Sequence, residues 1–422
     1  MTPFEYALKI RGLVKKHHKR RKDCIGLNAA ENIASTLVRE IISSDACRRI
    51  SVRSKGRRIY GGTEHLDEAI DVTCELAKKL FDADYVEIPV TGNIAAFAVL
   101  LGLAKPGDTV LSLSSSDNNG GYPLPERLSA AGYGIRVHHF PFNELEMNID
   151  TPVAVDQICK LKPKLIMLGA SEFLFPHPVK EVCEAAEDVD ANVFYDGAHV
   201  LGLIAGGEFQ DPFKEGVKIL VGGTNKSFPG PHRGIILAKD EEELFDRIVN
   251  TLRSPPLLQS TYDLSTTVAV GIAMAEMLEY GKSYARQIIK NSKALARELH
   301  SQGIDLLCPH KDFTQSHQVI QKIGDFCSAE AHQVKNKLEA ANILVDCVVR
   351  YGTSEVTRRG MKEVEMKQIA ELVRKVLIDG VDPNKVAGEV TEISRKFQKI
   401  HFCFETKDRA YEYFDLTPQT PM

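Results

Sequence analysis

The sequence predicts an α/β protein, with a large lobe built on a mostly parallel sheet and a smaller C-terminal α+β lobe. Short apolar runs alternate with helical-period segments between about residues 67 and 238, a pattern typical of sheets covered on both faces. After residue 265 a long helical stretch leads into a compact mixture of short strands and helices. A chain of 422 residues is also too long for one simple core, so more than one lobe is expected.

The first forty residues are predicted to be mainly helical, since Phe4, Leu8 and Leu13 are apolar positions ahead of the basic cluster at 15–21. In the large lobe we expect helices over 67–81, 94–104 and 179–187. The expected strands are short and apolar, and they cover 85–90, 109–113, 164–169, 192–195, 219–222 and 234–238. Ligands in such sheets bind beyond the carboxyl ends of the strands, so the residues just after each strand matter most.

The C-terminal part is predicted to begin with the long helix over 266–300. Beyond it we expect strands over 317–323 and 343–350 and helices over 329–341 and 362–378, the last of which is amphipathic. This pattern divides the chain into an N-terminal helical arm (1–45), a large α/β domain (46–275) and a small C-terminal domain (276–422).

Composition narrows the class of protein. Lys and Arg number 53 against 57 Asp and Glu, so the net charge of −4 argues against nucleic acid as a partner, and the basic cluster at 15–21 is expected to be a solvated helix face. No apolar run is long enough to span a bilayer, and the first residues lack the pattern of a secretory signal. Nine scattered cysteines without a C-x-x-C pair predict reduced thiols in a cytoplasmic protein.

Three sites that follow predicted strands are best interpreted together. Asp196 ends the strand in NVFYDGAH, and a buried carboxylate there must be paired or functional. Lys226 follows the next apolar run, thirty residues later. Thr91-Gly92-Asn93 forms a strand-to-helix turn whose exposed N–H groups favour a phosphate.

A carboxylate, a lysine and a phosphate cradle at successive strand ends match the needs of pyridoxal phosphate. The lysine forms a Schiff base with the aldehyde, and the carboxylate keeps the pyridinium nitrogen protonated. His199, three residues after Asp196, is placed to pack near the ring. Taken singly, each residue has an ordinary structural explanation, such as a surface lysine or a helix N-cap. A P-loop is rejected because Asn225 stands where its glycine would be, and no metal site is predicted because His310 and His317 lack a third ligand.

Longer motifs show a family resemblance over about residues 25–375. They are LNAAENIAS at 27–35, RRIYGGTEHLDEAI at 57–70, YDGAHVLGLIAG at 195–206, GGTNKSFPGP at 222–231 and RYGTSEVTRRGMKEVEM at 350–366. The chain resembles the serine hydroxymethyltransferases, and most of all their archaeal branch. These are pyridoxal-phosphate-dependent enzymes of the aspartate-aminotransferase fold (fold type I). The resemblance therefore implies that fold, and the interconversion of serine and glycine with a reduced pterin, tetrahydrofolate or tetrahydromethanopterin, as one-carbon acceptor.

The resemblance also implies roles for individual residues. Lys226 resembles the lysine that holds the cofactor covalently, and Asp196 resembles the partner of its ring nitrogen. The other cofactor contacts implied in this way are His199, Ser171, Thr91, Gly92 and Asn93. His199 also resembles a catalytic group beside the substrate.

Three further residues are implied to contact substrate. Arg350 resembles the arginine that binds the amino-acid carboxylate, a bidentate role suited to a guanidinium, and Glu31 lies in a motif stretch. Tyr60 resembles a catalytic tyrosine that reaches into the neighbouring subunit's site. Shared active sites imply a homodimer or homotetramer.

Some positions depart from the family pattern. Where the family carries Tyr-x-Glu, whose glutamate transfers protons, this chain has Ile50 and Val52, neither of which can do so. Glu31 and Glu64 are the acids in motif stretches that could take over that duty. Two alternatives therefore stay open. One is an aldolase or lyase that cleaves another β-hydroxy amino acid without a pterin, and the other is a non-catalytic paralogue that acts as a binding or regulatory subunit.

Overall fold

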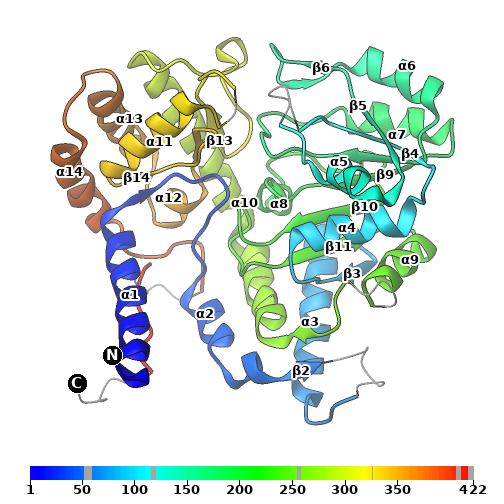
Figure 1. Ribbon diagram of the computed structural model, residues 1–422, viewed down its shortest axis with the longest axis horizontal. Helices are drawn as coiled ribbons and strands as arrows, with labels where there is room; N and C mark the ends of the chain where they lie inside the picture. The colour runs from blue at the N-terminus through cyan, green and yellow to red at the C-terminus, as the bar shows by residue number, and fades with distance from the viewer. Residues whose placement is uncertain (52–58, 116–119, 254–257, 326, 405–409, 417–422) are drawn as a thin grey trace.

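The computed structural model describes the chain except for residues 52–58, 116–119, 254–257, 326, 405–409 and 417–422. Figure 1 shows two lobes side by side, with the helix α10 (Leu264–Ser301) running between them. This helix confirms the long helical stretch expected over 266–300. The boundary expected at 275/276 falls inside α10, so the two lobes share one continuous helix at that point.

The large lobe is built on a seven-stranded sheet in the order β3-β11-β10-β9-β8-β4-β5. Its strands are β3 (Tyr85–Glu87), β11 (Gly234–Ala238), β10 (Ile219–Gly223), β9 (Asn192–Asp196), β8 (Leu165–Leu168), β4 (Thr109–Ser112) and β5 (Arg136–His139). β11 is antiparallel to both of its neighbours, and the other pairs are parallel. The carboxyl ends of β3, β10, β9 and β8 therefore lie at one edge of the sheet, as the sequence predicts.

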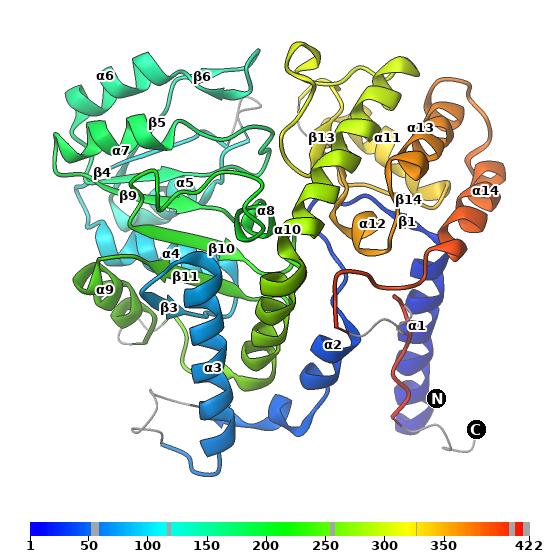
Figure 2. The ribbon, with the colours of Figure 1, turned by 180° about the vertical axis from the view of Figure 1, so that it is seen from behind.

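Helices cover both faces of this sheet because alternate strand residues point to opposite sides. Leu220 packs into one core with α3 (Glu64–Phe81), α6 (Thr151–Leu161), α7 (Val179–Glu187), α8 (Leu201–Ala205) and the first half of α10. Ile219 and Val221 pack into the opposite core with α4 (Gly92–Leu103), α5 (Leu124–Leu128) and α9 (Glu242–Arg253). Figure 2 shows α3, α7 and α8 on the near side of the sheet.

The small lobe has its own apolar core, to which the second half of α10 contributes Leu295 and Leu299. Its helices are α11 (Ala329–Ala340), α12 (Ser354–Arg358), α13 (Glu363–Leu377) and α14 (Pro383–Lys396). β13 (Gln318–Ile320) pairs antiparallel with β15 (Arg350–Gly352), and β14 (Ile343–Leu344) pairs parallel with β1 (Ile25–Gly26). Residues 25 and 26 of the expected N-terminal arm thus belong to the small lobe's framework.

The rest of the arm consists of α1 (Pro3–Asp23) and α2 (Thr36–Ile42), followed by the 3₁₀ turn η1 (Asp45–Arg48) and β2 (Ile50–Ser51). β2 pairs with β12 (Tyr262–Asp263) just before α10. None of the side chains of α1 is buried within this chain, and apolar residues such as Phe4, Ile10 and Leu13 are exposed on it.

One expected element is wrong and several went unpredicted. The strand expected over 343–350 is interrupted, because Asp346 turns the chain by accepting the N–H groups of Val348 and Arg350, and Val349 has a φ of 57°. The unpredicted elements include α5, α6, α8, α9, α12, α14, β1, β2, β5, β12 and the small hairpin of β6 (Phe142–Asn143) and β7 (Asn148–Ile149). Among the described residues, no helix is long and apolar enough to cross a membrane.

Candidate active site

A pocket of about 380 Å³ lies at the carboxyl ends of the strands. It is lined by residues from the end of β9 and the turn after it, from the loops after β4, β8 and β10, and from the start of α4. They are Thr91, Gly92, Asn93, Tyr122, Ala170, Ser171, Asp196, Ala198, His199, Gly223, Asn225, Lys226 and His232. The structure therefore brings together seven of the predicted site residues, namely Lys226, Asp196, His199, Ser171, Thr91, Gly92 and Asn93.

Lys226 lies in the loop that follows β10 and is half-buried at the pocket wall. Its backbone carbonyl accepts a hydrogen bond of 2.7 Å from Asn32 Nδ2, so the LNAAENIAS motif holds the lysine loop in place. Burial lowers the pKa of the Lys226 amine to about 8, although Asp196 raises it in part, and the positive charge of Arg350 lowers it further. A lysine with a pKa near neutrality supplies the uncharged amine that attacks a carbonyl.

Asp196 is the last residue of β9, where it lies opposite Val221 of β10. Its Oδ1 accepts a 2.9 Å hydrogen bond from the N–H of Ala198, which fixes the carboxylate in the turn. Burial raises the pKa of Asp196, while the Ala198 N–H and the Lys226 charge oppose the rise. A buried carboxylate in this position is suited to pair with a protonated ring nitrogen, because that pairing offsets its desolvation.

The Thr91 turn forms the third wall. Thr91 caps α4 by accepting a 3.2 Å hydrogen bond from Ile94 N, which leaves the first N–H groups of the helix facing the pocket. Two glycines permit this close packing. A Cβ on Gly92 would lie 3.2 Å from Gly222 O, and one on Gly234 would lie 2.2 Å from Thr91 O. The side chain of Asn93 is held by Tyr122, whose hydroxyl donates to Asn93 Oδ1.

These residues fit pyridoxal phosphate. The helix N-terminus at Gly92 and Asn93 suits the phosphate ester, the Lys226 amine suits the aldehyde, and the Asp196 carboxylate suits the ring nitrogen.

His199 is held by a residue from the small lobe, Gln318 of β13. Gln318 Oε1 accepts the N–H of Phe173 at 2.9 Å, and its Nε2 donates to Ser171 O at 3.0 Å. These two backbone partners orient the amide, so the second hydrogen on Nε2 points to His199 Nδ1, 3.0 Å away. His199 therefore accepts at Nδ1 and carries its proton on Nε2. Burial holds the pKa of His199 well below its usual range, so the ring is neutral.

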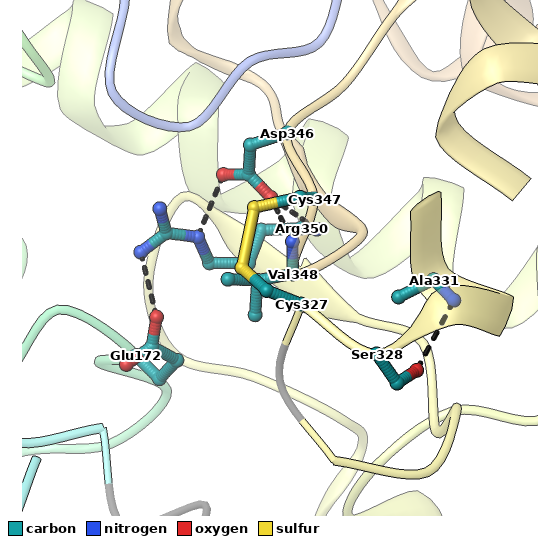
Figure 3. Close-up of a disulfide and its surroundings, with 8 residues drawn as sticks. All are labelled: Glu172, Cys327, Ser328, Ala331, Asp346, Cys347, Val348 and Arg350. Atoms are coloured by element: carbon teal, nitrogen blue, oxygen red, sulfur yellow. Dashed lines mark hydrogen bonds and ion pairs between the residues drawn. A yellow bond between two sulfur atoms is a disulfide. The ribbon is translucent and has the colours of Figure 1, made fainter. Parts of the chain in front are cut away.

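Arg350 lies beside the pocket and is already engaged by the protein (Figure 3). Its Nη1 donates to Ser171 O at 2.7 Å and to Glu172 Oε1 at 3.0 Å, and its Nε donates to Asp346 Oδ2 at 2.8 Å. Glu172 is buried, and this burial raises the pKa of its carboxyl to about 7 in spite of Arg350, with the Asp346 charge adding to the rise. One guanidinium is thus shared between two acids.

Like Arg350, the other two predicted substrate residues do not line this pocket. Glu31 lies in an adjoining pocket that shares Asn225 and His232 with the first, and its carboxylate pairs with Arg21 at 3.0 Å. Tyr60 precedes α3, at the end of that helix remote from the sheet, and is 52% exposed. The entry of Tyr60 into a neighbouring subunit's site stays a prediction. Val52 lies outside the described residues, as does the side chain of Ile50, while Glu64 is exposed at the first turn of α3.

Several functional candidates were missed from the sequence, namely Tyr122, His232, Glu172 and Gln318. Glu172 follows the post-strand residue Ser171 directly, so the rule that singled out Asp196 could also have found it. Gln318 could not be found by its position after a strand, because its role depends on how the small lobe contacts the large one.

The expectation of reduced thiols is wrong for one pair, since Cys327 and Cys347 form a disulfide. The fold brings two residues that are 20 positions apart to a Cα–Cα distance of 4.9 Å, which local spacing does not reveal. Cys347 is next to Asp346, so the bridge lies beside the residue that engages Arg350 (Figure 3).

Comparison with known proteins supports the assignment of this pocket. A model of the serine hydroxymethyltransferase family matches residues 5–373. The chain is 42% identical over 429 residues to a serine hydroxymethyltransferase from Methanothermobacter marburgensis, covering 98% of this chain and 99% of the relative. It is also 42% identical over 418 residues to the enzyme of that name from Methanocaldococcus jannaschii, covering 94% and 96%.

Among solved structures, the chain is similar to the crystal structure of an L-threonine transaldolase from Pseudomonas fluorescens in its internal aldimine state. The TM-score is 0.87 at 29% identity, and the match covers 95% of this chain and 94% of the other. This likeness confirms the predicted fold class, and the archaeal relatives confirm the predicted branch. The chain therefore belongs to the serine hydroxymethyltransferase family of pyridoxal-phosphate-dependent enzymes.

Proposed function

We propose that this protein is a serine hydroxymethyltransferase that binds pyridoxal phosphate covalently at Lys226 and transfers the hydroxymethyl carbon of serine to a reduced pterin. The observation that carries the proposal is the meeting of Lys226, Asp196 and the start of α4 in one pocket. In the overall reaction the Cα–Cβ bond of serine breaks, glycine leaves, and the one-carbon unit condenses with the pterin with loss of water.

The cofactor, when bound, supplies an electron sink for the pair left on Cα. The chain's own residues do the remaining work. Lys226 would hold the cofactor until the substrate amine replaces it, and would hold the cofactor again when the product leaves. Asp196 keeps the ring nitrogen charged, and His199 presents its Nε2–H donor from the pocket wall. Arg350 provides a guanidinium for the α-carboxylate.

Visible absorption spectra with pyridoxal phosphate test this proposal. We expect a visible absorption band of the Schiff base that is absent in Lys226→Ala and changes on addition of glycine or serine. Lys218→Ala is the matched control, because Lys218 lies just before the same strand but pairs with Glu241 at the surface. No band in the wild-type protein at saturating cofactor would refute the proposal.

A second candidate is a pterin-independent aldolase acting on another β-hydroxy amino acid. The structural similarity to a threonine transaldolase favours it, as does the pair Ile50 and Val52, which cannot transfer protons. Glycine formation from serine and from threonine, measured with and without tetrahydrofolate, separates the two. Serine cleavage that depends on the pterin supports the transferase, whereas threonine cleavage at the same rate with and without it supports the aldolase.

We also propose that the active protein is at least a homodimer with shared sites, completed by Tyr60 of the neighbouring subunit. The exposed apolar side chains of α1 and the exposure of Tyr60 support this. Two inactive variants, Lys226→Ala and Tyr60→Ala, should regain activity when unfolded and refolded together. About a quarter of the sites would then be intact, because half of the dimers are mixed and each has one complete site. No recovery, with mixed dimers demonstrated, would contradict shared sites.

A further inference from the structure

Arg350 has little hydrogen-bonding capacity left for a substrate. Both hydrogens of Nη1 are used, one by Ser171 O and one by Glu172 Oε1, and Nε is used by Asp346. Of the three guanidinium nitrogens of Arg350, only Nη2 has no hydrogen-bond partner among the described residues. A carboxylate that binds a guanidinium in the usual bidentate way needs two nitrogens, so it must displace Asp346 from Nε, or else Glu172 or the Ser171 carbonyl from Nη1.

The charges of this cluster also indicate that an acid must give way to the substrate carboxylate. With both acids ionised, the cluster of Arg350, Glu172 and Asp346 has a net charge of −1 before any substrate arrives. An α-carboxylate would bring a third negative charge to one guanidinium in a buried place, where charge repulsion is weakly screened. Asp346 is anchored by the N–H groups of Val348 and Arg350, whereas Glu172 comes from the other lobe, so Glu172 is the acid to be displaced.

We propose that Glu172 is a specificity-determining residue that competes with the substrate carboxylate for Arg350, so that an amino acid binds with uptake of one proton by Glu172. This inference rests on the proposed function, since it takes Arg350 as the carboxylate-binding residue. Protonated, Glu172 no longer contributes charge, and Nη1 is released to form the fork with Nη2. Ionised, it holds Arg350 and excludes an anionic substrate.

The groups around Glu172 allow such a titration near neutral pH. Three charged residues face it in the part of the chain that the structure describes. Arg350 lowers its pKa, Asp346 raises it, and Lys226 lowers it slightly. Burial is the largest effect and favours the neutral acid, which places the pKa at about 7. The backbone of Gly120 packs against Glu172, where a Cβ on Gly120 would lie 2.6 Å from Glu172 Cβ, and the Glu172 side chain is 6% exposed.

The test compares glycine with methylamine, which has the same amine but no carboxylate. Binding of each to the cofactor-loaded protein is followed by the change in the visible spectrum from pH 6 to pH 9. In the wild-type protein we expect the glycine dissociation constant, divided by that of methylamine, to rise about tenfold per pH unit above pH 7. In Glu172→Gln and Glu172→Leu the ratio should be flat. A flat ratio in the wild type, or a slope retained in both variants, would overturn the inference.

Asp346→Asn is the matched variant on the other side of the guanidinium. It removes the charge that raises the Glu172 pKa but keeps a hydrogen-bond acceptor. The pH above which the ratio of dissociation constants rises should therefore be lower than in the wild type. If that pH does not change, the acid that titrates is not Glu172.

A cofactor-free measurement separates this inference from the proposed function. The raised pKa of Glu172 stabilises the wild-type fold at low pH, and that contribution is lost as pH rises from about 4.5 through about 7. The melting temperature of apo Glu172→Gln minus that of the wild type should therefore increase between pH 5 and pH 8. If the melting-temperature difference increases but the cofactor gives no spectral band, only the proposed function is refuted. If the melting-temperature difference does not increase, the titration of Glu172 is refuted.

Discussion

Gln318 shows how a neutral side chain can decide the state of a functional one. Its amide is oriented by two backbone groups of the large lobe, and what remains is one hydrogen directed at His199 Nδ1. This arrangement makes His199 a donor at Nε2, the nitrogen left for a ligand. The position of one proton in the large lobe is therefore set by a strand of the small lobe.

Replacing Gln318 with Glu should reverse this arrangement. A carboxylate can only accept, so His199 would move its proton to Nδ1, or gain a second proton. Long-range ¹H–¹⁵N spectra of histidine-labelled apo protein should show an unprotonated Nδ1 in the wild type and a protonated Nδ1 in Gln318→Glu. Gln318→Met, which neither donates nor accepts strongly, is the control for packing. A wild-type spectrum with the proton on Nδ1 would contradict the described geometry.

The sequence was sufficient to predict the site residues that lie at the end of a strand or soon after it. Asp196, Lys226, Ser171 and the Thr91 turn all come directly after apolar runs, and all line the pocket. Gln318 and the pairing of Glu172 with Arg350 were not accessible in this way, because each joins the two lobes. No local pattern reports which surfaces of two lobes will meet.

At the scale of elements, the phosphate turn depends on how closely α4 approaches β10 and β11. Gly234 starts β11, and the backbone of Thr91 lies where its Cβ would be. The strands β8, β10 and β11 were predictable because they are continuously buried and apolar. β5 was not, because its residues RVHH are mostly exposed at the edge of the sheet.

Gly234→Ala should therefore push the Thr91 turn away from the sheet. A Cβ at 2.2 Å from a backbone carbonyl cannot be relieved by a side-chain rotation. We expect a loss of about 1–3 kcal/mol in the free energy of unfolding, and weaker binding of pyridoxal phosphate. Urea denaturation and cofactor titration measure the two effects.

Gly388→Ala is the matched control for that experiment. Gly388 lies inside α14 with nothing within 4 Å of its Cβ position, so alanine there should stabilise the protein by about 0.5–1 kcal/mol. Cofactor affinity should not change. If Gly234→Ala left both stability and affinity as in the wild type, the close approach of α4 to β11 would not matter for the site.

At the scale of the whole molecule, α10 joins the two cores. Its 38 residues span about 57 Å, and its side chains enter the large core at Ala269 and Val270 and the small core at Leu295. About a third of the way along the helix, Glu276 forms a fully buried ion pair of 2.6 Å with Arg358 of α12. Because the lobes share a helix and a buried charge pair, we expect them to unfold together.

Arg358→Met should be strongly destabilising, because it leaves Glu276 buried without a partner. A cost of about 3–5 kcal/mol is typical when one member of a buried pair is removed. The double variant Arg358→Met with Glu276→Leu should recover much of that loss, since no uncompensated charge remains. Chemical denaturation followed by far-UV circular dichroism measures both. A double variant no more stable than Arg358→Met alone would show that Arg358 acts through other contacts.

The bridge between Cys327 and Cys347 has a practical consequence. Cys327 is exposed to solvent, and Cys347 adjoins the residue that engages Arg350. A dithiol added during purification can therefore reach the bond, and preparations made with and without it differ chemically next to the Asp346–Arg350 ion pair. Affinities for amino acids carry meaning only when the thiol content of the sample is stated beside them.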